Sequence, residues 1–343
     1  MTGFNAFLRH VLDDLPFTAR EGVLPRGGRW QLIGDGLLLF DPPASRAADV
    51  LLSAGVHGDE TAPIEVCDAL IRDIASGELQ LATRVLFAFG NLAAMRAGKR
   101  YVDDDLNRLF RPQVAEAAKL NAKPRPDHSD GQRAGELEAA ARRFFLQAPL
   151  LPPGAVRLHY DMHTAIRGSQ IERFALYPYR ADGAWDRNEL AWLAGAGIEA
   201  VLLNDGPAGT FSYFTSAELR SHSFTLELGK VRPFGENDLS RFAGIDTGLR
   251  RLLAGDRQAQ PAPAPLRVFR VVHVLTKRSD AFQMHVPDDV LNFTAYPAGT
   301  VITEDGSERY AVSHQEERIV FPNRNVKKGL RAGLMVVETA LSG

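Results

Sequence analysis

Cysteine is almost absent from this sequence. Cys67 is the single cysteine among 343 residues. One cysteine excludes an internal disulfide framework and a cysteine-rich zinc module. Because Cys67 lies in an apolar stretch with helical spacing, it is expected to be a small core residue rather than a nucleophile.

The sequence also lacks an excess of positive or negative charge, and it lacks long apolar runs. The 40 Lys and Arg residues nearly balance the 42 Asp and Glu residues, which gives a net charge of −2. Nucleic acids and anionic membranes attract basic proteins, so neither is expected as a partner. No stretch reaches the roughly 18 consecutive apolar residues of a membrane span. Asp13 and Asp14 stand where a secretion signal needs apolar residues, so we expect a cytoplasmic protein.

Three common catalytic motifs are absent as well. The sequence has no G-x-S-x-G nucleophile elbow, no phosphate-binding P-loop and no glycine-rich dinucleotide fingerprint after a strand. The pattern therefore gives little support to a serine hydrolase, a P-loop NTPase or a nicotinamide-dependent enzyme.

Apolar, strand-like segments alternate with helical patterns through the first three quarters of the chain. The strand-like segments are residues 49–55, 84–91, 155–163, 173–178, 198–204 and 221–229. Helical spacing occurs in residues 59–76, 135–148, 185–197 and 236–255. This alternation predicts an α/β fold, with a mainly parallel sheet flanked by helices on both faces.

The composition changes at residues 258–267, a spacer rich in Pro and Ala. Beyond it, short strand-like segments and turns replace the helical patterns. We therefore predict a large domain over 1–257, a linker over 258–267 and a small β-rich domain over 268–343. Residues 111–134 are polar and contain proline, which predicts a surface excursion.

Three strand-like segments end in side chains that can bind a metal or a proton. "HGDE" contains His57 and Glu60, "DMHTA" contains His163, and "LELGK" contains Glu227. In open α/β sheets, ligands bind at the carboxyl ends of the strands, so these residues are expected on one rim. Two imidazoles and one carboxylate form the usual set for catalytic zinc, which leaves a fourth position for water.

Each of these residues also has an ordinary interpretation. Asp59 or Glu60 can simply favour the start of a helix. His159 alternates with His163 along the same segment and competes with it as a ligand, although His163 is better placed at the strand end. Glu227 can pair with Lys230, or it can be a general base whose pKa is raised by burial.

The segment 98–110, "GKRYVDDDLNRLF", gathers several charged residues after a strand-like segment. It reads either as a solvated loop with internal ion pairs or as an arginine clamp. Guanidinium groups bind carboxylates in a bidentate manner, which favours the clamp for a carboxylate-bearing substrate.

Together, "HGDE" (57–60), "GKRYVDDDLNRLF" (98–110), "DMHTAIRGS" (161–169) and "LELGK" (226–230) resemble the succinylglutamate desuccinylase/aspartoacylase family of zinc amidohydrolases. The four motifs occur in the family order, and the β-like C-terminal region extends the resemblance to nearly the whole chain. It implies a zinc-carboxypeptidase-like fold, with a mainly parallel mixed sheet flanked by helices and a small C-terminal β-rich domain.

The resemblance also implies roles for the rim residues. One Zn²⁺ per subunit would be bound by His57, Glu60 and His163. Glu227 would act as the general base and acid, and Arg100 would polarise the scissile carbonyl.

The same motifs imply a site for the substrate. Asn107 and Arg108 would bind a substrate carboxylate, and Asp105 would orient a zinc-bound histidine from behind. We add Arg167, four residues beyond His163, because a second anionic group on the substrate needs a second cation. The alternative, which the sequence favours equally, is that Arg167 is a surface arginine without a role in binding.

The implied reaction is hydrolysis of the amide of N2-succinyl-L-glutamate to succinate and L-glutamate, the last step of succinyl-based arginine catabolism. "DMHTAIRGS" and the chain length favour this branch of the family over the aspartoacylase branch. The rivals are deacylation of N-acetylaspartate or another N-acyl amino acid, carboxypeptidase activity, and a zinc-binding protein without activity. The expected partner is a small N-acyl amino acid. The sequence does not decide between a monomer and a homo-oligomer.

Overall fold

The computed structural model describes residues 6–44, 48–147, 152 and 154–341. Within these residues, thirteen strands form one sheet and three short strands form another. The main sheet contains β1 (Glu21–Val23), β2 (Arg29–Gly34), β3 (Leu37–Asp41), β4 (Ala48–Ala54), β5 (Arg84–Phe89), β6 (Val156–Ala165), β7 (Phe174–Tyr177), β8 (Ala200–Leu203), β9 (His222–Lys230), β10 (Arg267–Thr276), β12 (Thr294–Pro297), β15 (Glu316–Val320) and β16 (Arg331–Glu338). The small sheet contains β11 (Gln283–Met284), β13 (Val301–Asp305) and β14 (Glu308–Ala311).

The centre of the main sheet is parallel, and its edges are antiparallel. The strand order is β1-β2-β3-β5-β4-β6-β9-β7-β8-β10-β16-β15-β12. β5, β4, β6 and β9 run parallel to one another, and so do β7, β8 and β10. β7 and β9 meet in an antiparallel pair between these two groups. The carboxyl ends of β4, β6 and β9 therefore lie at one rim.

Helices cover both faces of the sheet. They are α1 (Phe7–Leu12), α2 (Thr61–Ser76), α3 (Leu92–Ala97), α4 (Ala118–Asn121), α5 (Ser129–Leu146), α6 (Arg187–Gly195), α7 (Phe211–Leu219) and α8 (Ala243–Leu253), with short 3₁₀ turns η2 (Leu106–Arg108), η3 (Ala115–Ala117) and η4 (Leu239–Phe242). None of the helices in the described parts of the chain is both long and apolar enough to cross a membrane.

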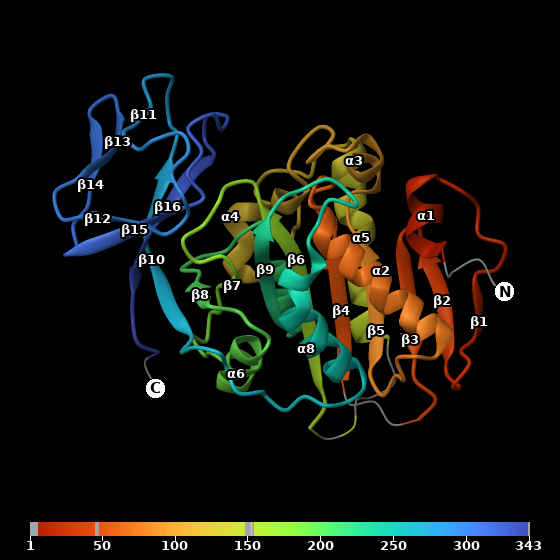
Figure 1. Ribbon diagram of the computed structural model, residues 1–343. Coiled ribbons are helices and arrows are strands. Elements are labelled where there is room, and N and C mark those ends of the chain that lie inside the picture. The colour runs from red at the N-terminus through yellow and green to blue at the C-terminus, as the bar shows by residue number, and fades with distance from the viewer. Residues whose placement is uncertain (1–5, 45–47, 148–151, 153, 342–343) are drawn as a thin grey trace.

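Alternating side chains of the strands build one hydrophobic core on each face. In β4, Val50 and Leu52 belong to the core that includes α2, α6 and α8. Leu51 points to the opposite face and belongs to the core that includes α5 and α7. This is the period of two that a strand buried on both faces requires. Figure 1 shows α2 and α8 in front of the strands and α5 behind them.

The strands of the C-terminal domain continue the main sheet. β10 pairs with β8 in parallel and with β16 in an antiparallel ladder. Arg267, the last residue of the predicted linker, is the first residue of β10. A shared core that includes Phe174, Phe269 and Phe293 joins the two parts of the sheet, and Figure 1 shows the C-terminal strands at its far end.

The predicted fold class is confirmed. Each of the six strand-like segments contains a strand, β4 to β9, and each of the four helical segments contains a helix. Ala148, the last residue of one predicted helix, lies outside the described residues. The predicted surface excursion over 111–134 is partly wrong, because α5 already begins at Ser129 and buries Asp130 and Arg133.

Candidate active site

The turn between β4 and α2 brings His57 and Glu60 to the rim of the main sheet. Gly58, between them, lies so close to α3 that a Cβ atom there would be 2.3 Å from backbone atoms of that helix. The Gly58 N–H donates to the carbonyl of Arg100 at 3.1 Å. Tight packing against the segment after β5 therefore fixes this turn, and only glycine fits at its centre.

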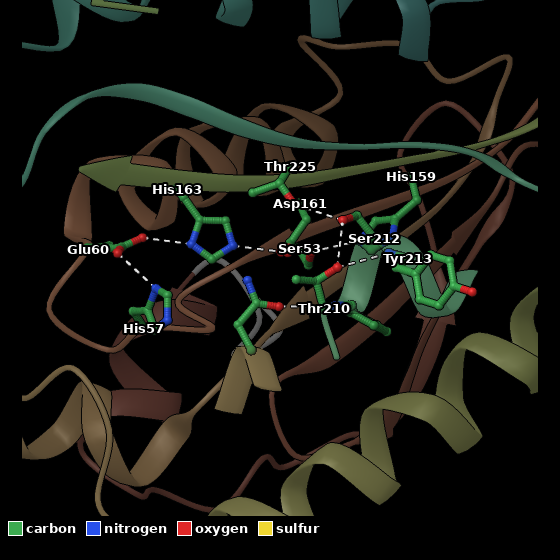
Figure 2. Close-up of polar contacts among 12 residues, drawn as sticks. Ser53, His57, Glu60, His159, Asp161, His163, Thr210, Ser212, Tyr213 and Thr225 are labelled. Atoms are coloured by element: carbon green, nitrogen blue, oxygen red, sulfur yellow. Dashed lines mark hydrogen bonds and ion pairs between the residues drawn. The ribbon is translucent and has the colours of Figure 1, made fainter. Parts of the chain in front are cut away.

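β6 lies beside β4 and brings His163 to the same place. Nδ1 of His57 lies 2.8 Å from Oε1 of Glu60, and Nδ1 of His163 lies 2.8 Å from Oε2 of the same carboxylate. The three side chains are buried, and one ligand atom of each lies within 4.8 Å of the others. Figure 2 shows both imidazoles turned toward Glu60. The sequence pattern predicted that His57, Glu60 and His163 lie together.

The outer nitrogen of each imidazole faces a second carboxylate. Nε2 of His57 lies 2.9 Å from Oδ1 of Asp105, and Nε2 of His163 lies 3.0 Å from Oδ2 of Asp161. Metal-binding histidines commonly have such carboxylates behind them, because the carboxylate fixes the tautomer and raises the basicity of the ligand nitrogen. Two Nδ1 atoms and one carboxylate then point inward. This donor set fits a catalytic zinc ion.

The protonation of the cluster follows from its charges. Burial opposes protonation of His163, but Asp161 and Glu60 outweigh it and hold the pKa of this imidazole well above its ordinary value. Burial likewise opposes ionisation of Glu60, but His57 and His163 hold the pKa of this carboxyl well below its ordinary value. Glu60 is therefore an anion surrounded by cations. A divalent metal that binds here can replace the protons on the two imidazoles.

His159 lies on the same face of β6 but has other partners. Its Nε2 lies 2.8 Å from Oγ of Ser53, and its Nδ1 lies 2.7 Å from Oγ1 of Thr215. Burial lowers the pKa of His159 to about 4, so this imidazole is neutral. Ser53 in turn donates to Asp161 at 2.5 Å, as Figure 2 shows. The structure thus places His163, and not His159, beside the other two candidate ligands.

Glu227 stands next to the cluster on β9. It is paired in register with His163 and is 8% exposed. Burial, and then the negative charge of Glu60, raises the pKa of Glu227 to about 7. Its Oε2 is buried without a hydrogen-bond partner in the described parts of the chain. No ion pair joins it to Lys230, which is exposed at the strand end.

The arginine-rich segment 98–110 borders the same cluster. Nη1 of Arg100 lies 2.6 Å from Oε1 of Glu60. Oδ1 of Asn107 accepts a hydrogen bond of 3.0 Å from the backbone N–H of Phe211, at the start of α7. The side chain of Arg108 is 43% exposed, and its guanidinium is 3.8 Å from Asp105. Nη1 of Arg108 donates to the carbonyl of Asn107 at 2.7 Å, and its other donors are free among the described residues for a molecule from solvent.

Arg167 has a partner elsewhere. Its guanidinium donates a hydrogen bond to the backbone carbonyl of Asp288, in the C-terminal domain. This contact ties the segment after β6 to that domain. The substrate-binding role of Arg167 stays a prediction.

Sequence reasoning missed the polar residues behind the cluster. Ser53 is opposite Asp161 in the β4–β6 pair, and Thr215 comes from α7, a helix that was not predicted. The alternation of His159, Asp161 and His163 was the available signal, because residues two apart share one face of a strand.

Family models match most of the chain. Residues 46–253 match the "Succinylglutamate desuccinylase/Aspartoacylase catalytic domain", and residues 264–339 match the "AstE/AspA barrel-sandwich hybrid domain". A succinylglutamate desuccinylase of Burkholderia lata is 51% identical over 339 residues, covering 97% of this chain and 93% of its own. One of Burkholderia orbicola is 52% identical over 341 residues, covering 96% of each chain.

Solved structures of the same description have this fold. The succinylglutamate desuccinylase of Chromobacterium violaceum is 45% identical, covers 99% of each chain and superposes with a TM-score of 0.82. The one from Vibrio parahaemolyticus is 34% identical, covers 97% of this chain and 95% of its own, and has a TM-score of 0.88. The chain belongs to the succinylglutamate desuccinylase/aspartoacylase family.

Proposed function

We propose that this protein hydrolyses the amide of N2-succinyl-L-glutamate to succinate and L-glutamate, and that it does so with a bound zinc ion. The observation that carries the proposal is the convergence of His57, Glu60 and His163 beside the buried carboxyl of Glu227. The substrate is inferred from relatives named succinylglutamate desuccinylase, which are about half identical over nearly the full length.

The proposed zinc ligands are Nδ1 of His57, Nδ1 of His163 and the carboxylate of Glu60. When bound, zinc supplies a Lewis acid that polarises the amide carbonyl and makes water more acidic. Asp105 and Asp161 hold the two imidazoles in the orientation that presents Nδ1 to the metal.

Glu227 moves the proton in this proposal. Amide hydrolysis needs a base that takes a proton from the attacking water and an acid that returns one to the leaving nitrogen. A carboxyl with a pKa near 7 can do both at neutral pH. Its unpartnered Oε2 is available to accept the proton from water.

Arg100, Asn107 and Arg108 bind the substrate in this proposal. Arg100, beside Glu60, donates to the carbonyl oxygen as negative charge develops on it. Arg108, with exposed donors, binds a substrate carboxylate together with the amide of Asn107. The contact between Asn107 and the start of α7 holds this pair in place.

We also propose that the reaction serves arginine catabolism and takes place in the cytoplasm. A near-neutral net charge agrees with a small-molecule substrate rather than a nucleic-acid partner.

A substrate panel tests the proposal. The protein is purified, its metal content is measured, and hydrolysis of N-succinylglutamate, N-acetylaspartate and a short peptide is compared. We expect about one zinc ion per chain and a kcat/KM that is highest for N-succinylglutamate. A higher kcat/KM for N-acetylaspartate or for the peptide would contradict the proposed substrate. Metal binding without hydrolysis of any of the three compounds would show that the protein binds zinc without this activity.

A further inference from the structure

Arg331 brings a positive charge from the C-terminal domain toward the candidate active site. It is the first residue of β16, and its guanidinium carbon lies 5.8 Å from the ring centroid of Phe321. The Phe321 ring packs against Phe174 at 5.7 Å between centroids, and Phe174 is paired with Glu227 across β7 and β9. A short chain of contacts therefore connects Arg331 to the proposed general base.

The charges that act on Arg331 are those of the active site. Burial, and then the like charge of Arg108, lowers the pKa of Arg331 to about 9, whereas Asp105 and Glu227 raise it. The guanidinium is still positively charged at neutral pH. Two arginines from different domains thus share one region with Asp105 and Glu227, and a further anion bound between the arginines would offset their mutual repulsion.

The guanidinium of Arg331 has no hydrogen bond or ion pair within the described residues, although it is only partly exposed. Neighbouring cations of the same segment do have partners. Arg324 lies 2.8 Å from the carboxylate of Asp288, and Lys327 lies 3.2 Å from that of Asp104. No nitrogen of Arg331 is among the buried unpartnered atoms of the described residues, so its donors reach solvent and are open to an anion that enters the site.

We propose that Arg331 is a substrate-binding residue contributed by the C-terminal domain, and that it binds a carboxylate of the N-acyl amino acid close to the one bound by Arg108. This inference rests on the proposed function for its substrate class. N-succinylglutamate carries three carboxylates, and Asn107 with Arg108 can serve only part of that charge. A second arginine from another element accounts for a second of these three carboxylates.

The alternative role for Arg331 is purely structural. A cation above the ring of Phe321 stabilises the C-terminal domain whatever substrate is present. A structural role therefore predicts the same change for every substrate. A binding role predicts a change that depends on one carboxylate.

The test compares Arg331→Gln and Arg331→Lys with the wild-type protein on N-succinylglutamate and on three analogues. The analogues each lack one carboxylate: N-acetylglutamate, N-succinylnorvaline and N-succinyl-4-aminobutyrate. We expect Arg331→Gln to raise the KM for N-succinylglutamate about 10- to 100-fold with a much smaller change in kcat. The increase in KM should vanish only for the analogue that lacks the carboxylate bound by Arg331. Lysine should restore part of the affinity, because it supplies the charge without the bidentate donors.

Arg270→Gln is the matched control, since Arg270 is an exposed arginine on β10 of the same domain. Arg167→Gln tests the other candidate cation in parallel. An equal penalty on all four substrates, no penalty at all, or a carboxylate-dependent penalty for Arg167→Gln alone would overturn the proposal for Arg331.

Failure of the proposed function is distinguishable from failure of this inference. Wild-type protein that leaves N-succinylglutamate intact contradicts the proposed function. The role of Arg331 is then read from calorimetric binding of succinate and of glutamate to the metal-loaded protein. Arg331→Gln should weaken binding of one of these dicarboxylates about tenfold or more, and unchanged binding of both would refute it.

Discussion

His163 and Glu227 are paired residues on the adjacent parallel strands β6 and β9. A proposed metal ligand and the proposed general base are therefore held by strand register and not by a loop. Both side chains are buried. Because strand positions are more rigid than loop positions, the distance between His163 and Glu227 is set before the substrate binds.

Replacement of Glu227 by Gln should remove activity and leave the metal in place. Gln has nearly the same size as Glu but cannot accept a proton, so we expect kcat to fall about 10²- to 10⁴-fold. Steady-state kinetics and metal analysis of the same preparation measure both effects. Glu236→Gln, at an exposed position, is the control. Near-normal turnover in Glu227→Gln would exclude this residue as the base.

The same substitution should stabilise the metal-free protein at alkaline pH. The pKa of Glu227 is raised from 4.5 to about 7, so the folded state binds this proton more tightly than the unfolded state. The stability from this group is present below pH 4.5 and is lost as the pH rises through about 7, by about 3 kcal/mol at most. Thermal unfolding at pH 4.5 and pH 8 should show a gain for Glu227→Gln only at pH 8. An equal effect at both pH values would contradict the raised pKa.

Replacement of Asp105 by Asn should weaken metal binding without abolishing it. Asn keeps the shape but removes the negative charge behind His57, and loss of such a partner typically costs about 10- to 100-fold in metal affinity. Competition with a chelator measures the affinity. His57→Ala should lose the metal at chelator concentrations that Asp105→Asn still tolerates. Asp289→Asn, exposed in the C-terminal domain, should behave like the wild-type protein.

Gly58→Ala should destabilise the protein and disturb the metal site together. The added Cβ would lie 2.3 Å from backbone atoms of Ala94 and Met95, which cannot move as a side chain can. We expect a loss of about 1–3 kcal/mol in the free energy of unfolding. Gly206→Ala is the control, because a Cβ there meets nothing within 4 Å. Denaturant unfolding of both variants checks the difference, and equal midpoints would show that the turn relaxes.

The sequence predicted those parts of the site that depend on local pattern. Apolar strands followed by His57 and His163 can be recognised because parallel strands end at one rim. Sequence pattern favoured His163 over His159 only because His163 stands at the strand end, since both residues lie on one face of β6. That choice depends on Ser53 and Thr215, whose proximity follows from strand order and from α7.

α7 was missed because its sequence, "FSYFTSAEL", is buried on most sides and shows no amphipathic period. Arg331 was missed for a different reason. More than 100 residues separate it from Glu227, and only the folded arrangement of the two domains brings its charge toward the site. Long-range contacts of this kind leave no periodic signal in the chain.

The parallel pairing of β8 with β10 has a consequence for how substrate enters. A domain that closed like a hinged lid would have to break the ladder from Arg267↔Ala200 to Arg270↔Leu203. We therefore expect the two domains to move as one rigid body and to unfold in a single cooperative transition. We expect the substrate to enter and leave past exposed side chains such as that of Arg108, without an opening between the domains.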